Sequence, residues 1–275
     1  MPRNIEIREI EAKHALGKSG MKELDYAYNP YLGCFHGCRY CYAIDMAPSD
    51  ASSSWGNIVY ARTNIITKLK QEMPGLKRGI VGISTITDPY QFIERKYGLA
   101  GEGIRLLALN GFHVTIQTKS PMVIKDIKTF IKYKKMIDIG ITVTTLNNSI
   151  AALIEPFAPS PESRLKAIKK LSDNGIAVWL YLGPIIRNLN DNIEEIEGII
   201  KFCSSNKIRI IYDSYQNYNG PSKYMEGTGY MVTEKGWWLD ISSKIQSLCL
   251  KYGIDCTRES EEWKYEQDRK QRKLF

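Results

Sequence analysis

No apolar run in this sequence is long enough to cross a membrane. A membrane-spanning helix needs about 18 or more consecutive apolar residues, and the 275 residues contain no such run. The first residues, MPRNIEIREIEAKH, carry charges throughout, which argues against a secretory signal. We therefore expect a cytoplasmic protein with no membrane partner.

Cysteine is scarce and unevenly placed. The sequence has six cysteines, and Cys34, Cys38 and Cys41 fall within eight residues. A secreted disulfide framework would spread its cysteines in pairs along a short chain. Clustering of this kind in a cytosolic protein indicates a metal site instead.

Internal repeats and low-complexity linkers are also missing. The length fits one large domain or two small ones. The formal net charge is +8, which suits an anionic partner such as a nucleic acid without identifying one. Part of this charge lies in the last residues, RKQRKLF, which a solvated tail would explain equally well.

From residue 79 onward, short apolar runs alternate with amphipathic stretches. The runs are rich in Ile and Val and nearly continuous, which is typical of parallel strands covered by helices. With an earlier strand at Leu24–Asn29 they make about six β-α units. The later runs are Gly79–Thr85, His113–Thr118, Asp138–Thr144, Ile176–Leu182 and Lys207–Tyr212.

Helical periodicity fills the gaps between these runs. Ile193, Ile196, Ile200 and Cys203 fall at helical spacing. Another apolar stripe ends before Gly175, where an Asn-Gly pair predicts the end of a helix and a turn.

This alternation predicts an α/β fold. We expect a partial (β/α)6 barrel of the TIM type, open on one side, and keep a doubly wound sheet as the alternative. Residues 1–215 would form the barrel with an N-terminal segment. Residues 216–275 would form a C-terminal, aromatic-rich helical extension that packs on the barrel.

The active sites of such barrels lie where the strands end, on the loops that follow them. The cysteine loop, NPYLGCFHGCRYCYA, follows the first strand and has the spacing C-x3-C-x2-C. Three thiolates can ligate three irons of a 4Fe–4S cluster, and the fourth iron keeps an open position. Gly33 and Gly37 would let the backbone wrap tightly around such a cluster.

Two other functions of this loop stay open. Its three cysteines and His36 could bind zinc, although His36 lies between two of the cysteines and leaves little room for paired knuckles. The loop could also belong to an electron carrier whose fourth cysteine lies far away in the sequence.

The cysteine loop resembles the cluster motif of radical S-adenosylmethionine (SAM) enzymes, in particular the spore photoproduct lyase-like branch. Further segments follow in that family's order and extend the resemblance over residues 5–215. These segments are TDPYQFIE at 87–94, TKS at 118–120, LIEPFAPSPESRL at 153–165 and GPIIRNLND at 183–191. The resemblance implies a barrel of the radical SAM type, with a 4Fe–4S cluster and SAM as cofactors.

The resemblance also implies roles for single residues. Cys34, Cys38 and Cys41 would hold the cluster and carry catalysis, and Tyr40 would pack beside the adenine of SAM. Lys119 would pair with the SAM carboxylate, although an exposed lysine at a strand end is equally ordinary. The other cofactor-binding candidates are Thr85, Thr87, Asp88, Thr142, Thr144 and Pro184.

Structural roles compete with some of these assignments. Asp88 before Pro89 also fits a helix start, and Thr142 and Thr144 also fit the β-propensity of threonine. In the segment LIEPFAPSPESRL we expect Glu155 and Arg164 to pair with each other and brace the loop, and not to contact a cofactor.

The implied reaction is reductive cleavage of SAM to a 5′-deoxyadenosyl radical, which abstracts a hydrogen atom from a substrate. A one-electron donor such as flavodoxin or ferredoxin would supply the electron. A nucleic acid suits the charge, and a peptide, a protein or a small metabolite are alternative substrates. An Fe–S electron carrier or a zinc-binding module without SAM chemistry is the alternative of another class.

The sequence also departs from spore photoproduct lyases. Those enzymes keep a further cysteine that returns a hydrogen atom to the product radical, but here no cysteine lies between Cys41 and Cys203. We therefore do not expect their dimer-splitting reaction. Cys203 and Cys249 lie on apolar helical stripes and are expected in the core, and Asp213, after the last strand, is a candidate partner for substrate.

Aromatic residues gather near the C-terminus. We expect most of them to cap the open end of the barrel and one or two to contact substrate. They are Tyr212, Tyr215, Tyr218, Tyr224, Tyr230, Trp237, Trp238 and Trp263.

Overall fold

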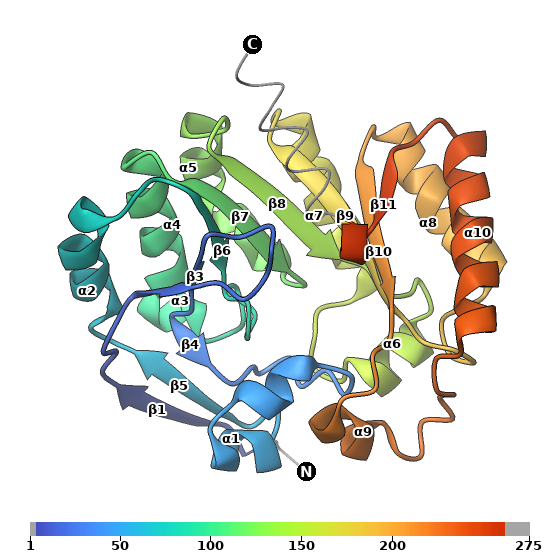
Figure 1. Ribbon diagram of the computed structural model, residues 1–275, viewed down its shortest axis with the longest axis horizontal. Coiled ribbons are helices and arrows are strands. Elements are labelled where there is room, and N and C mark those ends of the chain that lie inside the picture. Colours follow the sequence, from blue (N-terminus) through green and yellow to red (C-terminus); the bar gives the residue numbers. More distant parts are fainter. Residues whose placement is uncertain (1–3, 262–275) are drawn as a thin grey trace.

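The computed structural model describes residues 4–261, and its main feature is a curved eight-stranded sheet (Figure 1). The strands are β2 (Leu16–Lys18), β3 (Tyr26–Tyr28), β6 (Ile80–Ile83), β7 (His113–Thr118), β8 (Ile137–Thr142), β9 (Ala177–Ile185), β10 (Arg209–Ser214) and β11 (Cys256–Arg258). They lie in the order β11-β10-β9-β8-β7-β6-β3-β2. Every neighbouring pair is parallel except β2 and β3.

Helices connect the parallel strands and cover the outer side of the curved sheet (Figure 1). The helices are α1 (Ser49–Ser53), α2 (Ile65–Glu72), α3 (Glu94–Tyr97), α4 (Leu99–Leu109), α5 (Ile127–Lys132), α6 (Asn148–Ile154), α7 (Pro161–Asp173), α8 (Ile193–Ser205), α9 (Asn219–Met225) and α10 (Lys235–Lys251). Short 3₁₀ helices are η1 (Tyr42–Met46), η2 (Met73–Gly75), η3 (Pro121–Asp126) and η4 (Glu259–Glu261). The architecture is the partial TIM-type barrel predicted from the sequence, because parallel strands and covering helices alternate along the chain.

The predicted elements lie close to their observed positions. Strand β7 has the predicted bounds, and the other predicted strands differ from the observed ones by up to three residues at either end. Helix α7 ends at Asp173, and Gly175 has a φ of +69°, as the Asn-Gly pair indicated.

A second, three-stranded sheet was not predicted. It contains β1 (Glu6–Ile10), β5 (Ile58–Arg62) and β4 (Tyr31–Leu32) in the order β1-β5-β4. Strand β5 pairs parallel to β1 and antiparallel to β4. Strand β4 lies within the cysteine loop, directly before Gly33 and Cys34, so this small sheet fixes the first part of the loop.

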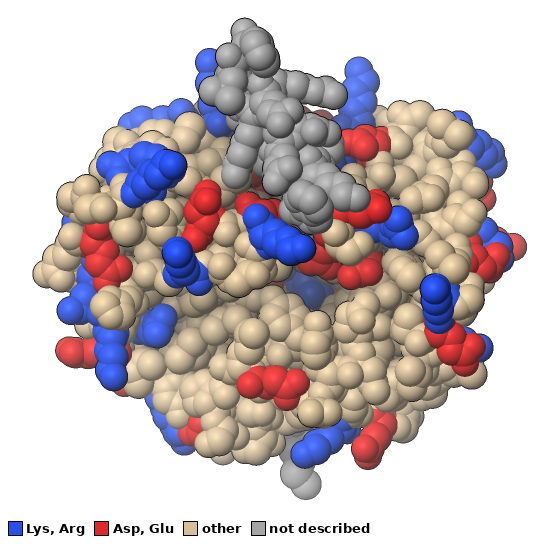
Figure 2. All heavy atoms as spheres, in the orientation of Figure 1, with Lys and Arg blue, Asp and Glu red and all other residues tan. Residues whose placement is uncertain are grey.

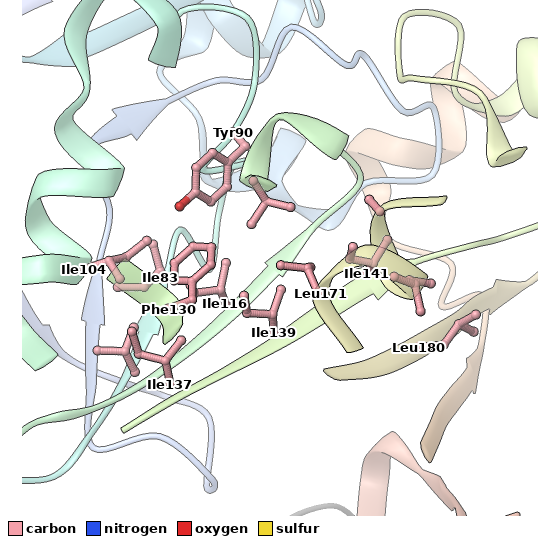
Figure 3. Close-up of a cluster of buried hydrophobic side chains, with 14 of the residues drawn as sticks. Ile83, Tyr90, Ile104, Ile116, Phe130, Ile137, Ile139, Ile141, Leu171 and Leu180 are labelled. Carbon is pink, nitrogen blue, oxygen red and sulfur yellow. The ribbon is translucent and has the colours of Figure 1, made fainter. Parts of the chain in front are cut away.

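The core lies between the main sheet and its helices (Figure 3). Ile83, Ile116 and Ile139 are paired neighbours on β6, β7 and β8, and all three are at most 3% exposed. Phe130 of α5 and Leu171 of α7, both fully buried, belong to the same hydrophobic cluster. A continuous apolar layer of this kind makes the strand ends a rigid platform for the loops that follow them.

The C-terminal part of the described chain adds to the barrel. Strand β11 pairs with β10, and α10 packs against α8. Trp237 and Trp238 pack against the main core, and Tyr212 is fully buried in it, whereas Tyr218 remains 48% exposed. Trp263 lies outside the described residues. None of the helices described here has the length and apolarity that crossing a bilayer requires.

Candidate active site

A cavity of about 1330 Å³ runs from the carboxyl ends of the strands into the barrel. The three cysteines of the loop all line it. Seven of the eight predicted cofactor-binding residues line the same cavity: Tyr40, Thr85, Thr87, Asp88, Lys119, Thr142 and Pro184. Residues that are up to 150 positions apart in the sequence therefore meet around one space.

The cysteine loop is shaped by two tight turns. The N–H of Gly37 donates to the carbonyl of Cys34 at 3.2 Å, and the N–H of Cys41 donates to that of Cys38 at 3.3 Å. Gly37 has a φ of +61°, which side chains rarely allow. A Cβ at this position would also lie 2.9 Å from the ring of Phe157. Glycine is thus required here by both conformation and space.

Gln91, which is fully buried, braces the loop from the motif TDPYQFIE. Its side-chain oxygen accepts a hydrogen bond from the N–H of Phe35 at 2.8 Å, and its nitrogen donates to the carbonyl of Gly33 at 3.2 Å. The hydroxyl of Thr87 donates to the same carbonyl at 2.5 Å. The sequence does not by itself identify Gln91 as a loop contact, although its place three residues after Asp88 in that motif is a usable signal.

Cys34 and Cys38 are buried in the wall of the cavity, and Cys41 is partly buried there. Burial raises the pKa of Cys34 to about 12 and also raises the pKa of Cys38 and Cys41. Such cysteines are protonated and poor nucleophiles, which argues against covalent cysteine catalysis. Metal binding would displace their protons, since only the thiolate is a ligand.

The donor set at this wall consists of the three thiols of the cysteine loop. An iron–sulfur cubane takes one thiolate on each of three irons and leaves the fourth iron open. These residues therefore fit the donor set that such a cluster needs.

His36 and Asp88 connect the cysteine loop to the end of β7. The Nδ1 atom of His36 lies 3.3 Å from the Asp88 carboxylate. That carboxylate also accepts hydrogen bonds from the Thr118 hydroxyl at 2.7 Å and the Lys119 N–H at 2.8 Å. Burial alone would raise the pKa of Asp88, but His36 and these donors hold it at about 2. His36 is thus held against the end of β7 through Asp88.

Lys119 places a positive charge beside the cysteine loop. Its Nζ atom lies 5.4 Å from the centre of the Tyr40 ring and 4.0 Å from a carboxylate oxygen of Glu155. Burial lowers the pKa of Lys119, but Cys38 in its thiolate form and the Glu155 carboxylate outweigh burial and the pKa is raised overall. The ammonium therefore stays charged at neutral pH and can bind a carboxylate of a ligand.

Behind this wall, Glu155 and Arg164 form a buried ion pair. Arg164 Nη2 lies 2.5 Å from Glu155 Oε2, and both residues are at most 2% exposed. The hydroxyls of Tyr40 and Thr144 donate to the other carboxylate oxygen, that of Thr144 at 2.6 Å. Burial alone would raise the pKa of Glu155, but Arg164 and Lys119 hold it at about 2. The expected pairing of Glu155 with Arg164 is confirmed.

Thr144 is the predicted cofactor-binding residue that does not line the cavity. Besides Glu155, its hydroxyl reaches the carbonyl of Gly183 at 3.4 Å. Asn190, 2% exposed, donates to the carbonyls of Thr144 at 2.7 Å and Pro184 at 3.0 Å. Asn190 thus joins the ends of β8 and β9, a role that the sequence analysis did not assign.

The deeper part of the cavity is polar. The Asp138 carboxylate accepts hydrogen bonds from His113 at 2.7 Å, Thr115 at 2.7 Å and Trp179 at 2.9 Å. Asp213 lines the wall, and burial raises its pKa. Polar groups thus share the cavity with the cysteine loop.

On the face in Figure 2, the described Lys and Arg side chains are scattered among Asp and Glu and form no continuous basic stripe.

Comparison with known sequences decides the family. A sequence model of the radical SAM superfamily matches residues 28–203. This chain belongs to the radical SAM superfamily. The uncharacterized protein MJ0683 of Methanocaldococcus jannaschii is 32% identical over 201 residues, which are 73% of this chain and 75% of that protein. The uncharacterized protein Rv2578c of Mycobacterium tuberculosis is 27% identical over 209 residues, which are 71% of this chain and 61% of that protein.

Radical SAM enzymes also share this fold among solved structures. Spore photoproduct lyase complexed with dinucleoside spore photoproduct superposes with a TM-score of 0.71 at 11% identity, over 92% of this chain and 81% of the lyase. Streptococcus suis SuiB bound to SAM gives a TM-score of 0.59 at 14% identity, over 94% of this chain and 51% of SuiB. At these identities the likeness concerns the fold.

Membership in the radical SAM superfamily confirms three predictions from the sequence. The chain is an enzyme, its fold is the partial barrel of that family, and its cofactors are the 4Fe–4S cluster and SAM that the family uses.

Proposed function

We propose that Cys34, Cys38 and Cys41 hold the 4Fe–4S cluster of this radical SAM enzyme, with one iron left open for SAM. When bound, the cluster would supply the electron that cleaves SAM to methionine and a 5′-deoxyadenosyl radical. A substrate in the same cavity would lose a hydrogen atom to that radical, beside the polar groups of the barrel wall. The observation that carries this proposal is that the three thiols, two of them buried, line one cavity together with Lys119.

The residues around the thiols have distinct tasks in this proposal. Lys119 binds the SAM carboxylate, because it is a cation on the cavity wall. The loop from Thr85 to Asp88 offers backbone carbonyls to the SAM ammonium, while the side chain of Asp88 stays bonded to the protein. The ring of Tyr40 and the backbone at Pro184 flank the adenine, and Thr142 faces the ribose or the carboxylate.

A nucleic acid is the substrate class that we propose to test first. Two observations support it: the net charge of +8, and a fold shared with a lyase that has been solved with a dinucleoside. The scattered charges on the face in Figure 2 weaken the charge argument. Binding of DNA and RNA should be strong at low salt and fall steeply as salt rises. Absence of binding at low salt would leave peptides and small metabolites as the substrates to test.

We propose that the chemistry within the barrel differs from that of spore photoproduct lyases. Among the described cysteines, only the three of the loop line the cavity, whereas Cys203 and Cys249 are buried in the core. No wall cysteine is thus available to return a hydrogen atom to a product radical. We therefore propose a reaction other than splitting of a thymine dimer.

The electron would come from a one-electron carrier of the flavodoxin or ferredoxin type. A reduced cluster and free thiols need a reducing compartment, and all six cysteines are free. We propose the cytoplasm as that compartment.

Release of 5′-deoxyadenosine tests the proposed function. The protein is purified without oxygen, reconstituted with iron and sulfide, and then mixed with dithionite and SAM. We expect release of 5′-deoxyadenosine by the wild type and none by Cys38→Ala, because the cluster loses a ligand.

Cys203→Ala is the matched control for this experiment. Cys203 is fully buried in the core, far along the sequence from the loop, so its loss should leave iron content and SAM cleavage intact. Continued release of 5′-deoxyadenosine by Cys38→Ala would refute the assignment of the cluster ligands.

A further inference from the structure

Glu155 lies behind the cavity wall, where several distant segments of the chain contact one another. It does not line the cavity, yet its carboxylate contacts Tyr40 from the cysteine loop, Thr144 after β8 and Arg164 of α7, and it lies 4.0 Å from Lys119 after β7. Two of these residues, Tyr40 and Lys119, line the cavity. A single buried carboxylate thus connects the cysteine loop to the cation of the site.

We infer that Glu155 is a positioning residue of the SAM site, which fixes the ring of Tyr40 and the ammonium of Lys119 at the wall of the cavity. This inference rests on the proposed function. It assigns to Glu155 a role in cofactor affinity, beyond the bracing of its own loop.

The charges of the network support this role. Glu155 carries one negative charge and faces two cations, Arg164 at 2.5 Å and Lys119 at 4.0 Å. Arg164 is held further by the carbonyls of Pro159 at 2.8 Å and Thr142 at 3.3 Å. Among the described residues, Lys119 has its ion pair with Glu155 alone. Its positive charge is thus incompletely neutralised and can attract the carboxylate of a ligand.

The hydrogen bonds of the network restrain the aromatic ring. The Tyr40 hydroxyl donates to Glu155 and lies 3.3 Å from the Thr144 hydroxyl. The Tyr40 ring cannot move away from the cavity without removing one hydrogen-bond donor from the buried Glu155 carboxylate, which costs free energy. Tyr40 also lies between Cys38 and Cys41 in the sequence, so its position and that of the cluster ligands are coupled.

Glu155→Gln is the variant that tests this role, because it keeps the size of the side chain and removes the charge. The matched control is Glu162→Gln, which removes a 75% exposed carboxylate from the first turn of α7. In reconstituted enzyme we expect equal iron and sulfide content in both variants. In Glu155→Gln, we expect the KM for SAM to rise about tenfold or more, as when a residue that holds a direct ligand of a metal site is replaced. The SAM concentration needed to alter the electron paramagnetic resonance (EPR) spectrum of the reduced cluster should rise by the same factor. The kcat should change less than the KM.

A double variant separates positioning from simple bracing. If Glu155 acts through Lys119, the two substitutions should not be additive. Glu155→Gln should then raise the KM for SAM much less in the Lys119→Met enzyme than in the wild-type enzyme. A Glu155→Gln enzyme with wild-type KM and wild-type SAM-dependent EPR change, and only a lower melting temperature, would overturn the inference.

Arg164 would lose its buried partner in Glu155→Gln, so a second variant covers the case in which that protein does not fold. Thr144→Val keeps the volume and removes one hydrogen bond to Glu155. We expect its KM for SAM to rise about threefold, and an unchanged KM would contradict the inference. A wild type without any SAM-dependent EPR change would instead refute the proposed function, and this inference with it.

Discussion

The ammonium of Lys119 lies 4.0 Å from the carboxylate of Glu155 and 5.4 Å from the centre of the Tyr40 ring. This contact joins the end of β7 to the segment between α6 and α7, and it places a charged group on the wall that the three cysteines share. The strength with which the enzyme binds SAM should therefore depend on charge at this one point.

Replacing Lys119 with Met should weaken SAM binding. The change keeps most of the apolar stem and removes the ammonium, so we expect the KM for SAM to rise about tenfold to a hundredfold, as when a hydrogen bond to a charged group is lost. Steady-state SAM cleavage measures this. Lys166→Met is the control, because Lys166 is 75% exposed and its ion pair with Glu162 contributes little. Equal KM values for the two variants would show that Lys119 does not bind SAM.

Replacing Gly37 with Ala should lower the iron content of the reconstituted enzyme. The backbone at Gly37 has a φ of +61°, and the new Cβ would lie 2.9 Å from the Phe157 ring. The conformational cost alone is about 1–2 kcal/mol, and the contact would shift the cysteine loop. Gly175→Ala is the control: its φ is +69°, and a Cβ there meets nothing within 4 Å. We expect Gly175→Ala to lose stability and keep its iron; loss of iron in both would mean that general destabilisation is the cause.

The stability lost in Glu155→Gln should not depend on pH between about 5.5 and 8. Arg164 and Lys119 outweigh burial and lower the pKa of Glu155 from 4.5 to about 2. The pKa of Glu155 is lower in the folded protein than in the unfolded chain. Its ionised carboxylate therefore stabilises the fold fully above about pH 4.5, and this stabilisation is lost only as the pH falls toward about 2. Removing one partner of such a buried pair costs about 3 kcal/mol. The melting temperatures of the wild type and of Glu155→Gln, taken across this pH range, measure the lost stability. A smaller difference between the two melting temperatures at pH 5.5 than at pH 8 would contradict the low pKa of Glu155.

The sequence contained the main features of the barrel. Apolar runs predicted strands because a parallel strand covered on both faces is buried along its whole length, as in β8 (Ile137–Thr142). In β7 only every second residue is buried. The cysteine spacing and the motifs after each strand likewise indicated which residues would line the cavity. All of those except Thr144 do so.

The parts that escaped prediction depend on contacts between distant segments. Strand β4 has two residues, and it is a strand only because Tyr31 and Leu32 pair with β5. Gln91 and Asn190 are ordinary polar residues whose roles arise from the backbone groups that the fold brings to them. Thr144 was assigned to SAM, but its hydroxyl faces Glu155, because the loop after α6 folds back behind the wall.

The EPR spectrum of the reduced enzyme, recorded with and without SAM, tests the central claim most directly. Anaerobically reconstituted wild type should contain about four irons and four sulfides per chain. On reduction it should show the signal of a 4Fe–4S cluster, and SAM should change that signal because it binds at the open iron. Protein that takes up only zinc, or a cluster signal that SAM leaves unaltered, would contradict the account.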